Sequence, residues 1–319
     1  MTIRSGAPRI AGPEALSEAV ALLAAGGLVA VPTETVYGLA ARADRDDAVA
    51  AIYRAKGRPS FNPLIVHIAD VVAGEALAEF DDRAHSLAAA FWPGPLTLVL
   101  PRRDNARLAP AVSAGLDSVA LRCPAHRLMR RLLEGCGFPL AAPSANRSGA
   151  ISPTMAAHVA ASLGGAVPLI LDGGPCQAGL ESTIVALRID GSWALLRPGP
   201  ITRAQLSTLL GAEGQPSGSS PVSIESPGQL ASHYAPTKPL RLGASGAAAD
   251  EFLIGFGPLS GDCNLSPTSD LAEAAARLYR CLHEADQAAP PRIAVVAVTD
   301  QGIGAAINDR LKRASAGSR

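Results

Sequence analysis

Short apolar runs alternate with longer amphipathic segments along most of the chain. Residues 28–31 and 169–172 are dominated by aliphatic side chains, which is typical of strands buried within a sheet. Residues 13–25 and 126–134 instead repeat apolar positions every three or four residues, which predicts helices that lie on a sheet. This order of elements predicts an α/β fold.

Further strands are predicted at residues 64–68, 96–100, 117–124, 140–142, 181–187 and 193–196. In two of these strands the alternation of side chains separates a polar residue from its aliphatic neighbours. His67 shares a face with Ile65 and not with Leu64 and Val66, and Arg122 shares a face with Ser118 and Ala120. We therefore expect an imidazole and a guanidinium on the same kind of sheet face.

The last third of the chain is predicted to form a second domain. Residues 211–221 are rich in Gly, Ser and Pro, as linkers are, and 319 residues exceed the size at which single cores stop growing. Residues 240–319 follow as strand, helix (271–284), strand (293–298) and helix, the pattern of a small Rossmann-like α/β domain. We expect a first domain over 1–210, a linker over 211–239 and a second domain over 240–319.

Charge and hydropathy exclude several classes of protein. The 28 basic and 28 acidic residues balance, so no overall field attracts nucleic acid, and an RNA role would need a local patch. The apolar stretch at 19–31 is interrupted by two glycines and is shorter than the roughly 20 residues of a membrane span. Residues 1–6 contain no apolar signal core. We expect a cytoplasmic protein that does not contact a membrane.

The five cysteines form no Cys-x-x-Cys pair. An odd number of scattered cysteines in a cytoplasmic protein predicts free, mostly buried thiols and no metal cluster. The residues concerned are Cys123, Cys136, Cys176, Cys263 and Cys281.

The chemistry is concentrated between residues 32 and 68. Pro-Thr-Glu-Thr-Val-Tyr-Gly at 32–38 leaves the end of a buried strand, where ligands of α/β folds gather. A helix capped by Asp46 or Asp47 and ended by Gly57 would leave Lys56 and Arg58 astride a turn with little cover. Hydroxyls, cations, an amide and an imidazole within one such span predict a polyanion site.

Each of these residues also has a structural interpretation. Lys56 and Arg58 could be a solvated helix end, His67 a hydrogen-bonded core histidine, and the threonines at 33 and 35 turn residues. Ser152, placed just before Pro153, could cap a helix as well as bind a phosphate, and Arg122 could face solvent. Only the combination of residues favours a binding site.

The combination resembles the threonylcarbamoyl-AMP synthase family, the YrdC/Sua5 group. The resemblance is carried by Pro-Thr-Glu-Thr-Val-Tyr-Gly at 32–38, by Lys-Gly-Arg at 56–58 with Asn-Pro-Leu at 62–64, and by Pro-Ser-Ala-Asn at 143–146. It extends over about residues 10 to 240, and residues 240–319 resemble the accessory domain of the long, Sua5-type form. The resemblance implies a twisted mixed-sheet domain with a concave active-site surface, followed by the small Rossmann-like domain.

The activity implied by the resemblance is a nucleotidyl transfer. L-threonine and bicarbonate form an N-carboxy adduct that attacks the α-phosphorus of ATP, which yields threonylcarbamoyl-AMP and pyrophosphate. This is the first step of N6-threonylcarbamoyladenosine (t6A37) modification of tRNA. Mg²⁺ is expected with ATP, though the sequence indicates no protein ligand for it, and the product would pass to a tRNA threonylcarbamoyl transferase with a weak contact to tRNA. No protein nucleophile is needed, and the sequence contains no Walker A or Gly-x-Gly-x-x-Gly motif.

The resemblance also assigns roles residue by residue. The implied threonine pocket contains Thr35, His67, Arg122, the backbone of Ala142, and Ser182. The implied nucleotide site contains Lys56, Arg58, Asn62, Ser118, Ser144, Asn146, Ser152, Arg197 and Tyr234. The transition state is expected to be stabilised by Lys56, Arg58, Ser144 and Asn146.

The chain departs from the family pattern at two sites, one a single residue and the other a pair. Ala186 stands where the family commonly has Asp, which weakens a metal or positioning role at that position. The resemblance implies that the segment at 226–239 crosses the active site and closes over the nucleotide, and in this segment Ala231 and Ser232 replace a basic pair before His233 and Tyr234. The alternative to an enzyme is a non-catalytic maturation factor of the same fold that binds double-stranded RNA or a nucleotide.

Overall fold

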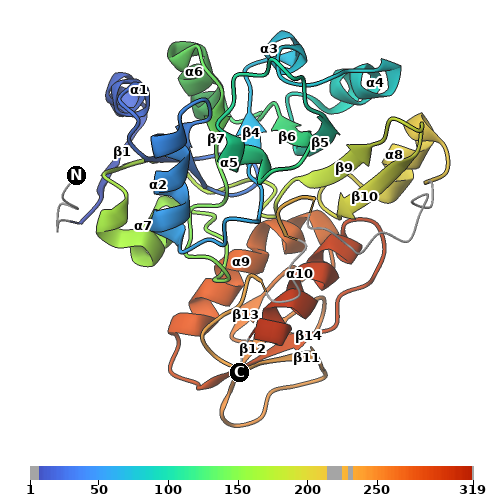
Figure 1. Ribbon diagram of the computed structural model, residues 1–319. Coiled ribbons are helices and arrows are strands. Elements are labelled where there is room, and N and C mark those ends of the chain that lie inside the picture. Colours follow the sequence, from blue (N-terminus) through green and yellow to red (C-terminus); the bar gives the residue numbers. More distant parts are fainter. Residues whose placement is uncertain (1–6, 214–224, 229–232, 318–319) are drawn as a thin grey trace.

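The computed structural model describes residues 7–213, 225–228 and 233–317 (Figure 1). Within these residues one large mixed sheet contains ten strands: β1 (Arg9–Ala11), β2 (Val29–Val31), β3 (Gly38–Arg42), β4 (Ile65–His67), β5 (Leu96–Pro101), β6 (Ser118–Arg122), β7 (Leu140–Ala141), β8 (Leu169–Leu171), β9 (Thr183–Leu187) and β10 (Trp193–Arg197). Their order across the sheet is β1-β8-β2-β3-β7-β4-β6-β5-β9-β10. Strands distant in the chain are therefore neighbours at the centre of the sheet.

The helices of this domain cover the two faces of the sheet unequally. They are α1 (Leu16–Ala24), α2 (Asp46–Lys56), α3 (Val71–Glu75), α4 (Asp82–Phe91), α5 (Pro110–Ser113), α6 (Arg127–Cys136), α7 (Ala156–Leu163) and α8 (Arg203–Leu210), with short 3₁₀ turns at Pro13–Ala15 and Gly164–Ala166. One face shares a core with α2, α4, α5, α7 and α8. On the other face α1 and α6 pack against β2, β3, β7 and β8.

The half of this second face formed by β4, β6, β5 and β9 carries a small separate apolar cluster that contains Ile65, Ala120 and Ala186. No helix of the described part of the chain contributes to that cluster. Since β4 and β6 run parallel with His67 opposite Arg122, both side chains project from this face beside Ile65 and Ala120. The predicted alternation in these two strands is confirmed. Among the described residues, no helix covers this part of the sheet face, which leaves room for a site.

The second domain contains a smaller sheet of parallel strands in the order β11-β14-β12-β13. Its elements are β11 (Leu240–Ala244), β12 (Glu251–Gly255), β13 (Cys263–Asn264), α9 (Leu271–Gln287), β14 (Arg292–Val296) and α10 (Gly304–Gly317). Figure 1 shows this domain in orange and red below the large sheet, with α9 and α10 toward the first domain. The α/β prediction, a twisted mixed-sheet domain followed by a small Rossmann-like domain, is confirmed.

Two predicted helix caps are wrong. Helix α2 is capped by Arg45, whose side chain makes no capping hydrogen bond, because Asp46 and Asp47 already belong to the first turn. The positive φ of 61° at Gly57 does end this helix as predicted. Ser152 caps no helix, since α7 begins four residues later at Ala156.

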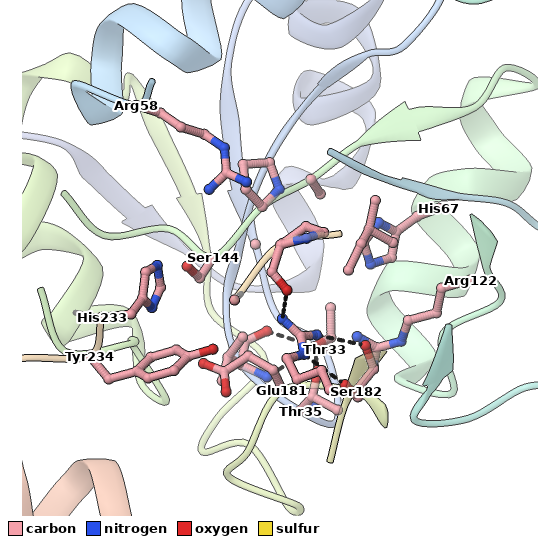
Figure 2. A pocket seen from close by; sticks show the side chains of 18 residues that line it. Thr33, Thr35, Arg58, His67, Arg122, Ser144, Glu181, Ser182, His233 and Tyr234 are labelled. Carbon is pink, nitrogen blue, oxygen red and sulfur yellow. Dashed lines mark hydrogen bonds between the residues drawn. The ribbon is translucent and has the colours of Figure 1, made fainter. Parts of the chain in front are cut away.

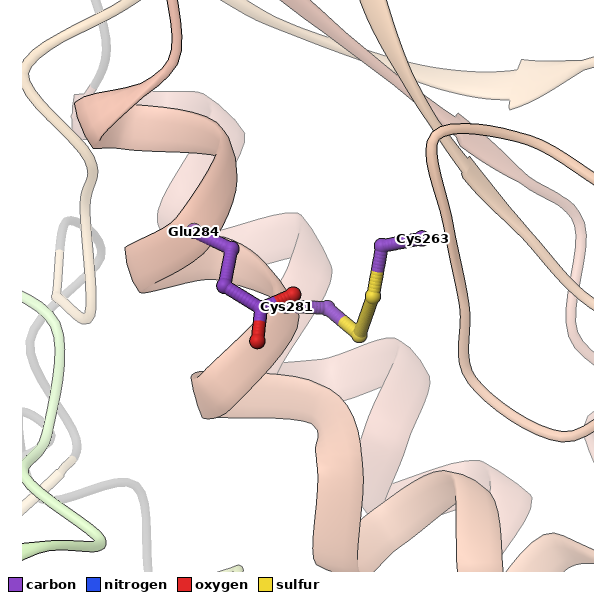
Figure 3. A group of neighbouring side chains, drawn as sticks. All are labelled: Cys263, Cys281 and Glu284. Atoms are coloured by element: carbon purple, nitrogen blue, oxygen red, sulfur yellow. A yellow bond between two sulfur atoms is a disulfide. The ribbon is translucent and has the colours of Figure 1, made fainter.

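The prediction of five free thiols is also wrong. Cys263 of β13 and Cys281 of α9 form a disulfide, and Glu284 lies one helical turn from Cys281 (Figure 3). The pair was hidden in the sequence because 18 residues separate the two cysteines, which meet only when α9 packs on the small sheet. Cys123, Cys136 and Cys176 are free.

Two sequence predictions fall partly or wholly on residues that are not described. Most of the linker expected at 211–239 belongs to them, as do Ala231 and Ser232. Among the described helices, none is both long and apolar enough to span a membrane.

Candidate active site

A buried cavity of about 40 Å³ opens onto the uncovered half of the large sheet (Figure 2). The residues that line it come from strand ends and loops distant in sequence. Nine of the residues assigned by resemblance are among them: Thr35, Arg58, His67, Arg122, Ala142, Ser144, Ser182, Arg197 and Tyr234. The fold thus gathers most of the predicted set around one space.

The turn after β2 supplies two hydroxyls. Thr33 Oγ1 donates to the carbonyl of Val36 at 2.6 Å and accepts from the backbone N–H of Val36 at 3.2 Å. The same hydroxyl lies 2.8 Å from that of Thr35, and both threonines are buried and line the cavity. Thr33 therefore has the predicted turn role and also fixes Thr35 beside the cavity.

Arg58 is a buried cation rather than a solvated helix end. Its side chain crosses from the end of α2 toward the cavity, where Nε donates to the carbonyl of Asn62 and Nη2 to that of Pro63. Burial lowers the pKa of Arg58 to about 10, so the guanidinium stays charged at neutral pH. The expectation of little cover is wrong because the 59–64 loop folds back over this side chain. A charge held by two carbonyls in a dry site interacts strongly with an anion.

Lys56 lies behind the cavity and connects two loops. Its Nζ donates to the carbonyls of Ser144 and Asn146, both at 2.5 Å. Burial, with a further contribution from the charge of Arg58, lowers the pKa of Lys56 well below its usual value. Asn146 in turn donates to the carbonyls of Arg147 and Ala150. Lys56 and Asn146 therefore shape the loop that presents Ser144 to the cavity.

Arg122 is paired with an acidic residue to which the sequence analysis gave no role. Its Nη2 donates to Glu34 Oε1 at 2.6 Å, and its Nε donates to the carbonyl of Gly94. Glu34 Oε2 also accepts from the backbone N–H groups of Ala125 and His126, ahead of α6. Although burial would raise the pKa of Glu34, Arg122 and these backbone groups lower it. Glu34 thus fixes the guanidinium at the edge of the cavity and neutralises its charge.

His67 faces Arg122 across the β4–β6 ladder. Burial, and next the charge of Arg122, lower the pKa of His67 to about 3, so the ring is neutral at physiological pH. Its Nδ1 has no hydrogen-bond partner among the described residues. A neutral ring with a free nitrogen suits a substrate hydrogen bond better than a core role.

The strand ends of β9 and β10 form the third side of the cavity. Arg197 Nε donates to the carbonyl of Ser182 at 3.0 Å, and Nη2 donates to its hydroxyl at 3.1 Å. Ser182 Oγ also lies 2.7 Å from Thr97 Oγ1. The hydroxyl of Ser182 is therefore held from two sides next to a buried cation.

The fourth side is formed by Pro227, Gly228, His233 and Tyr234, which lie in the chain between α8 of the first domain and β11 of the second. Gly228 has a φ of +90°, and a Cβ there would lie 2.9 Å from Arg197 Cδ and 3.0 Å from Tyr234 Oη. Only glycine lets the chain pass this close to both side chains. That this segment crosses an active site stays a prediction, and its described residues lie beside the cavity.

Three residues assigned by resemblance, besides Lys56 and Asn146, do not line the cavity. Asn62 is buried behind Arg58, and neither polar atom of its side chain has a partner within the described chain. Ser118 begins β6 and shares a sheet face with Ala120 and Arg122, but it is farther from Arg122 along the strand than Ala120 is. Ser152 is fully buried, and its hydroxyl likewise has no partner among the described residues.

The sequence analysis assigned no role to two acidic residues and one histidine of this region. Glu181 and His233 line the cavity, and Glu34 lies directly behind Arg122. The sequence contains only two indications of these carboxylates: Glu34 stands inside the 32–38 motif, and Glu181 comes directly before Ser182. Their partners are more than 80 residues away, so neither role could be inferred from local pattern.

The site combines several buried cations with hydroxyls, a neutral imidazole and backbone groups. Such a site suits an anionic substrate and a small polar one, and it contains no triad for nucleophilic attack within the described residues. The fold and the cavity therefore define a class, a two-domain α/β enzyme with a site for anionic substrates on the large sheet. Comparisons with known proteins identify the family within that class.

The Sua5/YciO/YrdC family model, described as "Telomere recombination", matches residues 21–199, and the model of the threonylcarbamoyl-AMP synthase C-terminal domain matches residues 201–316. The chain is 42% identical to the threonylcarbamoyl-AMP synthase of Bacillus subtilis over 95% of its length and 93% of that protein. It is 38% identical to the Pyrococcus abyssi protein of the same name over 91% of each. The crystal structure of P. abyssi Sua5 with L-threonine matches with a TM-score of 0.86 and 36% identity, over 98% of this chain and 97% of that one. The chain belongs to the threonylcarbamoyl-AMP synthase family in its long, two-domain form.

Proposed function

We propose that this chain is an L-threonylcarbamoyladenylate synthase, which forms threonylcarbamoyl-AMP and pyrophosphate from L-threonine, bicarbonate and ATP. The observation that carries the proposal is the convergence of Arg58, Arg122 and Arg197 on one buried cavity lined by hydroxyls. The family membership and the relatives named above support it. Formation of threonylcarbamoyl-AMP is the first step of t6A37 modification of tRNA.

In the reaction, an oxygen of the threonine carbamate forms a bond to the α-phosphorus of ATP. The bond from that phosphorus to the bridging oxygen breaks, and pyrophosphate leaves with the electron pair. The protein has to align the two anions and neutralise their charge, and alignment alone can contribute roughly 7 to 11 kcal/mol. Preorganised cations in a dry site provide the electrostatic part.

For threonine, we assign Thr35, His67, Arg122, the backbone of Ala142, and Ser182. Gly94 accepts from Nε of Arg122 and Glu34 accepts from one N–H of Nη2, so the substrate carboxylate would use Nη1 or the second N–H of Nη2. The neutral ring of His67 lies directly beside this guanidinium. The pair would distinguish a carboxylate from a neutral group.

For ATP, we assign Arg58, Asn62, Ser118, Ser144, Ser152, Arg197 and Tyr234. Arg58 and Ser144 reach the cavity and would contact the phosphates in the transition state. Lys56 and Asn146 act on the same step through the loop that carries Ser144, since Lys56 donates to its backbone. A cavity of about 40 Å³ cannot hold ATP, because small-molecule sites occupy about 300 Å³ or more. The side of the cavity formed by Pro227, Gly228, His233 and Tyr234 would open to admit the nucleotide.

Mg²⁺ enters this scheme as part of the substrate MgATP. Among the described residues that line the cavity, Glu181 is the one carboxylate, and its Oε2 already accepts from Tyr279 and Arg310. Such a donor set does not build a dedicated cation site. The triphosphate and water would carry the ion, as is usual for Mg²⁺.

The labile product would pass to a separate tRNA threonylcarbamoyl transferase, with at most a weak contact between this chain and tRNA. Balanced charge supports this division of labour. A reaction that serves tRNA belongs in the cytoplasm. The alternative, an RNA-binding factor without turnover, is disfavoured by a site that is a small buried cavity and not an open groove.

The direct test supplies ¹³C-bicarbonate with ATP and L-threonine and analyses the nucleotides by mass spectrometry. We expect a labelled adenylate whose mass includes threonine and one carbonyl carbon. Label-free AMP or ADP as the sole products would contradict the proposal.

A further inference from the structure

Helix α9 of the second domain presents one stripe of residues to the first domain. Ala275, Ala276, Tyr279 and His283 recur at helical spacing along this stripe. A Cβ on Gly179 would lie 2.5 Å from Ala276 Cα and 2.6 Å from Ala275 O, so the two backbones touch there. Farther along, His283 Nε2 lies 3.2 Å from the carbonyl of Ser152. This interface passes directly behind the cavity.

Glu181 is the point where this interface meets the site. Its Oε2 accepts from Tyr279 Oη at 2.9 Å and from Arg310 Nε of α10 at 2.8 Å. Arg310 is fully buried and Glu181 is 5% exposed, so this ion pair is shielded from water. Burial would raise the pKa of Glu181, but Arg310 first and Arg197 next lower it to about 2, so the carboxylate is charged.

The Glu181–Arg310 pair lies next to Ser182, which is assigned to L-threonine, and next to Tyr234, which is assigned to ATP. Glu181 precedes Ser182 in the chain and lines the cavity itself, while the guanidinium carbon of Arg310 lies 5.2 Å from the centre of the Tyr234 ring. A cation at that distance over an aromatic face attracts the ring. Tyr234 also packs in the core of the second domain with Ile151 and Leu180 of the first. Moving Arg310 would thus displace Glu181 on one side and Tyr234 on the other.

A buried ion pair is a poor source of stability, because desolvation offsets most of its attraction, but it fixes one geometry. We propose that Glu181 and Arg310 form an interdomain positioning pair, through which the second domain holds Ser182 and Tyr234 in the geometry that binds L-threonine and ATP. The pair acts on the substrates through these two residues. The proposal rests on the function proposed above, and it gives the second domain a role in a cavity that none of its residues from β11 onward lines.

The test uses the full-length chain with Glu181→Gln, Arg310→Met and the double variant. We expect each single variant to raise KM for both L-threonine and ATP at least fivefold. The double variant should be no worse than the more damaged single one, because it leaves no unpaired buried charge. Lys312→Met, on an exposed position of the same helix, should leave both KM values unchanged. Each variant is also measured for thermal midpoint and for L-threonine binding by calorimetry.

A purely structural pair would lower the thermal midpoint while both KM values stayed within twofold of the wild type, and that result would overturn the proposal. Additive losses in the double variant would do the same. If Arg310→Met does not fold, Tyr279→Phe removes one hydrogen bond from the same carboxylate, and both KM values should still rise at least twofold. Wild-type protein without turnover, but with threonine binding that the variants weaken, would contradict the proposed function and leave the positioning role standing.

Discussion

Arg58 shows how a cation that the sequence places at a helix end becomes part of a site. The left-handed Gly57 ends α2 and turns the chain, so that the next side chain points inward and is buried among carbonyls. Its charge has no carboxylate partner in the described part of the chain. An unneutralised, preorganised cation of this kind is suited to a charge that appears only when substrate binds.

At this position we expect Arg58→Ala to slow turnover by about 2 to 4 kcal/mol, by comparison with the loss of single oxyanion donors. The reason is that the developing charge on the phosphates loses its buried counter-charge. Steady-state kinetics of pyrophosphate release would measure it, with Arg54→Ala on an exposed position of α2 as the control. If kcat is equal in the two variants, Arg58 does not stabilise the transition state.

Arg122→Ala should act on binding instead. We expect the KM for L-threonine to rise at least tenfold, while the KM for ATP changes less than twofold, because Arg122 and His67 lie at the end of the cavity away from Arg58 (Figure 2). Loss of Arg122 also leaves Glu34 charged and buried, so the double variant Glu34→Gln, Arg122→Ala serves to separate folding from binding. Arg127→Ala, at an exposed site on α6, is the matched control. An unchanged KM for L-threonine in both variants would show that Arg122 does not bind the substrate carboxylate.

At the scale of elements, the site depends on which strands end next to one another. Apolar runs predicted β2 and β9. In β4 and β6 the alternation of side chains also predicted the faces from which His67 and Arg122 project, because burial of one sheet face imposes a period of two. The order of strands was not predictable in this way. Neighbours such as β3 and β7 are about 100 residues apart in the chain, and local pattern carries no information on such pairing.

The 173–180 loop of the first domain packs closely against α9 of the second at Gly179. We expect Gly179→Ala to destabilise the protein by about 1 to 3 kcal/mol, since the new methyl group overlaps the backbone of α9. Gly174→Ala is a matched control, because Gly174 also has a positive φ (+82°) but no atom within 4 Å of the added Cβ. Urea unfolding of both variants would separate conformational strain from overlap. Equal losses of stability would show that strain alone is responsible.

Only the site residues that stand in local motifs could be predicted from the sequence. Thr35, Arg58, His67 and Ser144 stand in compact motifs, and all four line the cavity. Glu181 could not be assigned, because Arg310 follows it by 129 residues and Tyr279 by 98. Lys56 was assigned to the substrate but is used by two backbone carbonyls, a contact that no sequence pattern indicates.

At the scale of the whole molecule, the two domains share buried residues rather than a simple linker. Val36, Ile151 and Leu180 of the first domain pack into the core cluster of the second, together with Tyr234. Binding and the packing of the two domains are thus expected to be coupled.

Stability should depend on pH through buried imidazoles. Burial lowers the pKa values of His67 and His233 to about 3, below their usual 6.5, so between these values the unfolded chain binds more protons than the folded one. Stability is therefore greatest above pH 6.5 and is lost as pH falls toward 3. We expect His67→Gln to reduce the slope of unfolding free energy between pH 6.5 and 5 by up to about 1.4 kcal/mol per pH unit.

Chemical denaturation at several pH values would measure this slope, with the exposed His85→Gln as the control. A slope that is the same in His67→Gln and in the wild type would mean that His67 is not held neutral.

The account as a whole is tested most directly by pyrophosphate release from ATP, measured with L-threonine and bicarbonate each present or omitted. The proposed chemistry predicts release only when both are present, since neither alone forms the carbamate that attacks the α-phosphorus. Release that needs neither would indicate a nucleotide hydrolase and contradict the account. Absence of release with all three substrates, together with binding of RNA, would favour the maturation factor instead.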